Sequence, residues 1–325
     1  MGAFRQIKLI LLIIFYNIRM FFSKTTKGFY YSKIGVLHFE LENYYTSIIH
    51  FNKSRKYSYN DSLFTEYNTY YLGYCYLNLG DYKKAIKYLE QCINKNNEDE
   101  ILELLGWCYL MVSNYSMAKK MYEKLNVLDN YSIVNKIQYA KILIEMGDKN
   151  KALESLSQAE SINHDSIVNG VIKSIKYKLK GELIKSIDIL ENVIKSKYTE
   201  VKEGKYFKLE DLYLFLAELQ KENESHKEAL STLEESHKKN SKDIWIKNAL
   251  AMEYAEQKLK LKEALTLINQ CILHQPENPI FIDTKAWILY RLQKKKLSKE
   301  FIEKSLNLNP DSKMAQQHFD EISRL

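Results

Sequence analysis

Small and large apolar positions recur along this chain with a period of about 34 residues. The small residue stands inside a stretch rich in apolar side chains, at Gly35, Gly73, Gly106, Ala140, Ser174, Ala217, Ala251 and Ala286. Five of the seven intervals are 33 to 35 residues long, and the others are 38 and 43. A second small residue follows 12 or 13 positions later, and a large apolar residue follows four positions after that. Two helices can cross closely only where side chains are small, so the pattern predicts a series of helix pairs.

The second and third repeats carry the clearest motif. One contains Leu72-Gly73-x-x-Tyr76 and then Ala85, and the next contains Leu105-Gly106-x-x-Tyr109 and then Ala118. These residues resemble the tetratricopeptide repeat, a helix-turn-helix unit of about 34 residues. The resemblance covers residues 28–325. It implies an all-α, right-handed superhelical solenoid of about eight units with a C-terminal capping helix.

The repeat boundaries follow from this register. We expect a solenoid over residues 28–325, with repeats near 28–61, 66–98, 99–132, 133–166, 167–200, 210–243, 244–278 and 279–312 and a cap over 313–325. The fifth repeat departs from the pattern, because Gly170 lies inside its first helix. A nine-residue insertion at 201–209 explains the 43-residue interval, and such a loop is a candidate for an accessory contact. Gly80, Gly147 and Gly181 lie seven residues after a small position, where a glycine can end the first helix.

Residues 1–27 precede the repeats and contain an uninterrupted apolar run. The run comprises Leu9, Ile10, Leu11, Leu12, Ile13, Ile14, Phe15 and Tyr16, with Arg5, Lys8 and Arg19 around it. No small-residue cleavage site follows, which argues against a secretory signal. A helix that spans a membrane, or lies in its headgroup layer, fits the run, and we expect membrane association through this segment. The alternative is a helix that packs on the first repeat as a cap.

Composition and charge narrow the functional classes. The 325 residues include 46% hydrophobic and 27% charged residues, only three prolines and ten glycines, and carry a net charge of +7. This composition is typical of a globular helical chain, and the mild positive charge does not demand a nucleic acid partner. The four cysteines have no metal-binding spacing. We interpret them as buried apolar residues, which favours a reducing compartment and a cytoplasmic repeat domain.

Catalytic chemistry has no signature in this sequence. The zinc-protease motif HExxH, the nucleophile elbow GxSxG and the phosphate-binding glycine motifs are all missing. The seven histidines are scattered and never four residues apart. We therefore predict no enzyme activity, no cofactor and no metal site.

The family resemblance directs attention to the groove lined by the first helices. Projected on this sequence, the groove positions that we expect to bind a partner are Tyr67, Tyr70, Tyr74, Trp107, Met111, Trp245, Trp287, Tyr290 and Arg291. Aromatic, methionine and arginine side chains are typical of binding hot spots. The expected function is a scaffold that binds an apolar or aromatic-rich protein segment, with packing against the next repeat as the alternative role for these residues. A second hypothesis is a solenoid that binds RNA or a polysaccharide through basic and aromatic side chains.

Overall fold

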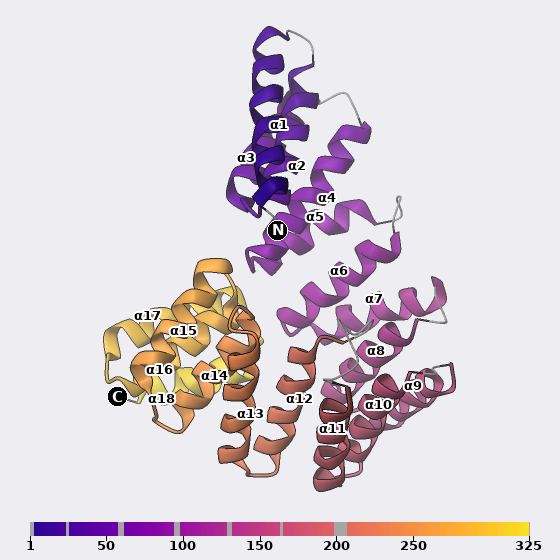
Figure 1. Cartoon of the computed structure of the whole chain (residues 1–325), viewed down its shortest axis with the longest axis vertical. Helices are drawn as coiled ribbons and strands as arrows, with labels where there is room; N and C mark the ends of the chain where they lie inside the picture. Colours follow the sequence, from indigo (N-terminus) through magenta and orange to yellow (C-terminus); the bar gives the residue numbers. More distant parts are fainter. Residues whose placement is uncertain are drawn as a thin grey trace. The chain divides into compact units, whose positions relative to one another are not determined.

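The computed structural model describes the backbone of residues 3–23, 26–57, 62–93, 98–128, 132–162, 165–197 and 207–324. These residues form helices and turns without strands, so the predicted all-α class is confirmed (Figure 1). The helices are α1 (Ala3–Phe22), α2 (Lys27–Glu40), α3 (Tyr44–Tyr57), α4 (Ser62–Asn78), α5 (Tyr82–Leu89), a 3-10 turn η1 (Glu90–Cys92), α6 (Glu98–Met111), α7 (Tyr115–Leu128), α8 (Ile133–Glu145), α9 (Lys149–Ile162), α10 (Ser166–Leu179), α11 (Leu183–Lys197), α12 (Leu209–Glu222), α13 (His226–Lys239), α14 (Ile244–Glu256), α15 (Leu261–His274), α16 (Pro279–Arg291), α17 (Lys295–Leu308) and α18 (Lys313–Ser323).

The chain divides into two compact units. Unit 1 comprises residues 1–112 and 275–278, and unit 2 comprises residues 113–274 and 279–325. Unit 1 therefore contains α1 to α6, and unit 2 contains α7 to α18. In both units the small residues predicted from the period lie where paired helices meet, and most of them are fully buried.

Close helix crossings explain why those positions are small. A Cβ atom added at Gly35 of α2 would lie 2.9 Å from the ring of Phe51 on α3. At Gly73 of α4 it would lie 2.7 Å from the Leu89 side chain of α5. These distances are shorter than van der Waals contact, so a larger residue would force the helices apart.

One turn geometry ends the first helix of every repeat. Gly80, Gly147 and Gly181 adopt positive φ angles of 77°, 81° and 77°. The same position, seven residues after the small residue, also has positive φ where it is not glycine: 61° at Glu42, 57° at Ser113, 58° at Glu224, 54° at Lys258 and 60° at Gln293. A left-handed residue at a helix end is costly without glycine, so five repeats accept local strain to keep the turn.

The N-terminal segment corrects one expectation. Among the described helices, none is both long and apolar enough to cross a bilayer. The predicted membrane localisation through this segment is therefore wrong. The physical reason is that Arg5, Lys8 and Arg19 interrupt α1, which leaves far fewer than the ~20 apolar residues that a span needs.

α1 packs instead on α2 within unit 1. Leu9 is buried, Arg5 Nη2 lies 3.5 Å from Glu40 Oε2, and the Tyr16 and Tyr30 rings are 6.1 Å apart. The other predicted membrane residues are exposed (Ile10, Leu11, Ile14 and Phe15) or partly buried (Leu12 and Ile13). The capping alternative is thus the one that these contacts support.

The sequence also predicted an insertion at residues 201–209 and a capping helix at residues 313–325. Residues 201–206 of the predicted insertion lie outside the described residues, and α12 begins at Leu209. Ser312 caps α18 by accepting a hydrogen bond from the Ala315 backbone. α18 buries Ala315, His318 and Ile322, which agrees with a capping helix that covers the last repeat.

Candidate partner-binding surface

In unit 1 the predicted residues gather on α4 and α6. Tyr67 and Trp107 are 41% and 36% exposed, whereas Tyr70, Tyr74 and Met111 are partly buried. The Tyr70 and Tyr74 rings stand 6.0 Å apart at a steep angle. These five side chains form what we call the aromatic surface of unit 1.

The aromatic surface rests on rings that the sequence projection did not single out. Phe39 of α2 contacts Tyr74 and Tyr71, with both pairs of ring centroids 5.2 Å apart. Tyr71 in turn stacks on the buried ring of Phe51 at 5.3 Å and contacts Tyr67 at 4.8 Å. Because such pairs add to the energy of simple burial, the exposed rings are held on a rigid base.

Carboxylates border the aromatic surface on α6. The Tyr70 hydroxyl donates a 2.7 Å hydrogen bond to Glu100 Oε1, which ties α4 to α6. Burial, together with this bond, raises the pKa of Tyr70 and keeps it protonated. Burial also raises the pKa of Glu103, and the neighbouring Glu100 and Asp99 raise it further. The surface is therefore both aromatic and anionic.

In unit 2 the predicted residues form a stack rather than an open surface. Trp287 is only 2% exposed, and its ring lies 4.2 Å from the His318 ring and 4.4 Å from the Arg291 guanidinium. Arg291 also lies 3.6 Å from Glu256 of α14, and the Tyr290 ring stacks on Trp287 at 4.9 Å. Trp245 is partly buried against Phe281, with ring centroids 5.0 Å apart.

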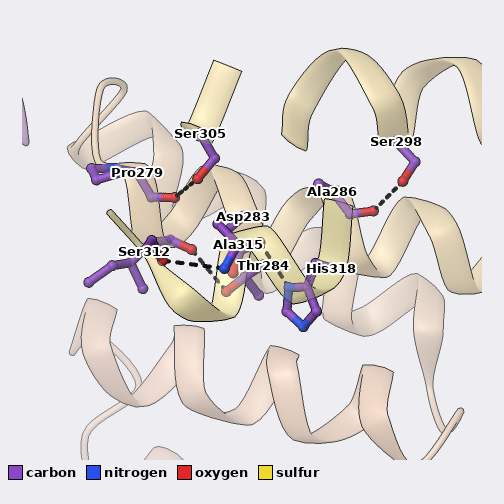
Figure 2. A network of polar contacts seen from close by, with 10 residues as sticks. Pro279, Asp283, Thr284, Ala286, Ser298, Ser305, Ser312, Ala315 and His318 are labelled. Carbon is purple, nitrogen blue, oxygen red and sulfur yellow. Dashed lines mark hydrogen bonds and ion pairs between the residues drawn. The ribbon is translucent and has the colours of Figure 1, made fainter. Parts of the chain in front are cut away.

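Polar contacts join α16 to both α17 and α18 near this stack. Figure 2 shows the ring of His318 pointing at Asp283 of α16, with its Nδ1 atom 2.8 Å from Asp283 Oδ1. Nearby, Ser305 donates to the Pro279 carbonyl at 2.8 Å and Ser298 to the Ala286 carbonyl at 2.9 Å (Figure 2). Both members of the histidine–aspartate pair are at least nine-tenths buried, so α18 closes off this end of α16.

Reactive or metal-binding groups do not gather elsewhere in the described ranges. Among these residues, no cluster of three or more histidine, cysteine or acidic side chains could hold a metal ion. All four cysteines are buried, as predicted. A pocket between α10 and α11 is lined by Ser166, Ile167, Ile189, Asn192, Val193 and Ser196, and none of the predicted binding residues belongs to it.

Two protein-family models match parts of this chain. A tetratricopeptide repeat model matches residues 136–165 and 283–312, and the model of subunit 3 of the anaphase-promoting complex (cyclosome) matches residues 40–125. The chain is a tetratricopeptide-repeat protein. No curated protein sequence matches it.

Solved tetratricopeptide-repeat structures are similar in fold at low identity. A tetratricopeptide-repeat protein from Parabacteroides merdae is 13% identical, with 80% of this chain and 99% of that chain covered and a TM-score of 0.48. The Cut9–Hcn1 hetero-tetramer of the APC/C is 14% identical, with 90% and 56% covered and a TM-score of 0.47. YrrB, described as a TPR protein with an unusual peptide-binding site, is 17% identical, with 60% and 96% covered and a TM-score of 0.37.

Tetratricopeptide-repeat proteins generally act as protein-binding scaffolds, and the repeat itself is typically non-catalytic. In this tetratricopeptide-repeat protein the groove residues projected from the sequence do not include Glu100. A helical wheel could have found it, because Glu100, Glu103 and Trp107 are spaced three and four residues apart and share one face of α6. No comparable pattern in the sequence indicated that the rings of Phe39 and Tyr71 support this surface.

Proposed function

We propose that this protein is a non-catalytic adaptor that binds a protein or peptide segment on the aromatic surface of unit 1. The observation that carries the proposal is the exposure of Tyr67 and Trp107, two large side chains on first helices of consecutive repeats. Rings of this kind lose little conformational entropy on binding and dominate the energy of many interfaces. Tyr70, Tyr74 and Met111 extend the same surface.

The predicted residues of unit 2 have a different part in this proposal. Trp287 is buried in contact with His318 and Arg291, so its main contribution is to the packing of α16 and α18. Trp245, Tyr290 and Arg291 are only partly buried and keep part of their surface accessible.

The non-catalytic part of the proposal rests on the state of the nucleophiles. Burial raises the pKa of Cys75, Cys108 and Cys271 to about 12, so these thiols stay protonated. Burial likewise raises the pKa of Tyr70 and Tyr74. A catalytic nucleophile needs the opposite shift, toward a lower pKa.

The RNA-binding hypothesis has less support than the protein-binding one. The aromatic surface of unit 1 is bordered by Asp99, Glu100 and Glu103, which would repel a phosphate backbone. We therefore commit to a protein segment as the partner.

The test is a comparison of captured partners. Full-length wild type and two double variants are crosslinked in cell extract. The test variant is Tyr67→Ala/Trp107→Ala. The control variant is Tyr45→Ala/Tyr57→Ala, which removes two exposed tyrosines of α3. We expect the first variant to lose partners that the wild type and the control retain. Identical partner sets for all three proteins would refute binding through the aromatic surface.

A further inference from the structure

Three carboxylates form the anionic edge of the aromatic surface. Asp99, Glu100 and Glu103 follow one another on the first two turns of α6, and Glu103 is exposed. Within the described part of the chain, none of these three carboxylates pairs with a lysine, arginine or histidine. Like charges at such spacing repel one another, so a positive group brought by a partner would stabilise this edge.

Two tyrosines border these carboxylates. The Tyr70 hydroxyl holds the Glu100 carboxylate in a fixed orientation through its 2.7 Å hydrogen bond. The Tyr74 ring lies 6.0 Å from the ring of Tyr70, and the charges of Glu100 and Glu103 add to the effect of burial in raising the pKa of Tyr74. A side chain that bound here would meet aromatic rings and carboxylates together.

Unit 2 contains a similar pair of an acidic residue and a tryptophan, and there a histidine of the same chain contacts both. Repeat register aligns Glu103 and Trp107 of α6 with Asp283 and Trp287 of α16, because each tryptophan directly follows the small residue of its repeat. At α16 the flat ring of His318 contacts Asp283 through nitrogen at 2.8 Å and stacks on Trp287 at 4.2 Å with an interplanar angle of 14°. The acid–tryptophan pair therefore accepts a planar, nitrogen-bearing side chain from another helix.

Arg291 supplies a second precedent beside the same tryptophan. Its guanidinium lies 4.4 Å from the Trp287 ring centroid and 3.6 Å from the Glu256 carboxylate. In α6 the position aligned with Arg291 is Met111. Arginine combines stacking on an aromatic ring with charge-assisted hydrogen bonds to carboxylates, which lysine does not do equally well.

Building on the proposed function, we propose that the surface formed by Tyr70, Tyr74, Glu100, Glu103 and Trp107 binds an arginine side chain of the partner segment. The guanidinium stacks on the aromatic rings and donates hydrogen bonds to the carboxylates of Glu100 and Glu103. The partner is thus a protein segment that presents arginine, and its recognition depends on charge as well as on apolar contact.

The probe is a fluorescein-labelled peptide of four Gly-Ser-Arg units, compared with the same peptide in which citrulline replaces arginine. Citrulline keeps the shape of arginine but is neutral. Fluorescence anisotropy is measured on full-length wild type, on Glu100→Gln/Glu103→Gln, and on the control Glu228→Gln/Glu321→Gln. The control removes the same charge from exposed positions of unit 2.

We expect wild type and control to bind the arginine peptide about tenfold more tightly than the citrulline peptide. The Glu100→Gln/Glu103→Gln variant should lose this preference while its thermal unfolding stays unchanged. Equal affinity for the two peptides, no binding of the arginine peptide, or an equal loss in both glutamine variants would overturn the proposal.

The failures of the two proposals are distinguishable. If partner capture depends on Tyr67 and Trp107 but the arginine preference is missing, only the arginine site is refuted. If neither the peptide nor the captured partners respond to Tyr67→Ala/Trp107→Ala, the proposed function itself is refuted.

Discussion

The Ser47 hydroxyl donates a buried 2.7 Å hydrogen bond to the backbone carbonyl of Gly35, twelve residues earlier. The same bond recurs at the helix crossings of two other repeats, from Ser186 to Ser174 at 2.7 Å and from Ser298 to Ala286 at 2.9 Å. Serine thus replaces alanine at the second small position without leaving a buried hydroxyl unpaired. Two helices are joined by packing and by a polar contact at the same point.

This relationship predicts the effect of removing the hydroxyl. Ser47→Ala should destabilise the protein by about 1 kcal/mol, the usual contribution of one buried hydrogen bond. Chemical denaturation measures the change. Ser47→Val is the companion variant, and it should cost more because the added carbons would collide with α2. A Ser47→Ala variant as stable as wild type would show that the bond is energetically neutral.

A second prediction concerns Gly170, the residue that makes the fifth repeat irregular. A Cβ atom on Gly170 would clash with Val193 Cγ2 of α11. Gly170→Ala should therefore destabilise by about 1 to 3 kcal/mol, although alanine is the better helix former. Val193→Ala removes the clashing methyl group. The double variant should lose less stability than the sum of the two single variants, as a double-mutant cycle by denaturation will measure; simple additivity would contradict the packing explanation.

The tryptophans offer a third prediction, which separates stability from binding. Trp287→Ala should destabilise by about 3 to 5 kcal/mol, because it empties a buried site between α16 and α18. Trp107→Ala should change the stability by less than about 1 kcal/mol, because its ring is partly exposed. Thermal and denaturant unfolding of the two variants provides the comparison. Equal losses would mean that Trp107 is a packing residue.

A fourth prediction concerns pH and the stacked pair His38 and His50 between α2 and α3. Their ring centroids lie 5.3 Å apart. Burial, followed by the charges of His38 and Lys53, lowers the pKa of His50 to about 4, and burial lowers the pKa of His38. An unfolded histidine has a pKa of about 6.5. Between these values the unfolded chain binds more protons, so the stability is complete above about pH 6.5 and falls as the pH decreases toward 4.

The variant His50→Phe provides the control for the pH effect. It retains an aromatic ring in the stack but cannot bind a proton. Unfolding by urea at pH 7.5 and 5.5 should show a smaller loss of stability in this variant than in wild type. The same loss in both proteins would assign the pH dependence to other groups.

The regular features of the fold could be predicted because they are local and repeated. Small residues at a 34-residue period gave the helix pairs, and glycine at three turns pointed to the left-handed residue that ends the first helix. The same conformation at Glu42 and Gln293 had no such signal, because those residues are not typical of positive φ. In these repeats the tertiary packing overrides local preference.

The candidate site could be predicted only in part. The projection identified Tyr67, Tyr70, Tyr74 and Trp107 as first-helix residues, and all four lie on the α4 and α6 surface. It assigned Trp287 the same role as Trp107, since their repeat positions are identical. The structure separates them: one ring is 36% exposed and the other 2%. One of the side chains that cover Trp287 is His318, which lies 31 residues further along the chain.

By itself the sequence determined the class of this protein, because the spacing of small and large side chains leaves few ways to bury the apolar faces other than helix against helix. It did not determine what α1 packs on, because an apolar run does not name its neighbour; the packing of α1 on α2 decided this. Nor did it determine which aromatic rings remain accessible. Accessibility is a property of what lies opposite a side chain, and residues distant in sequence decide it.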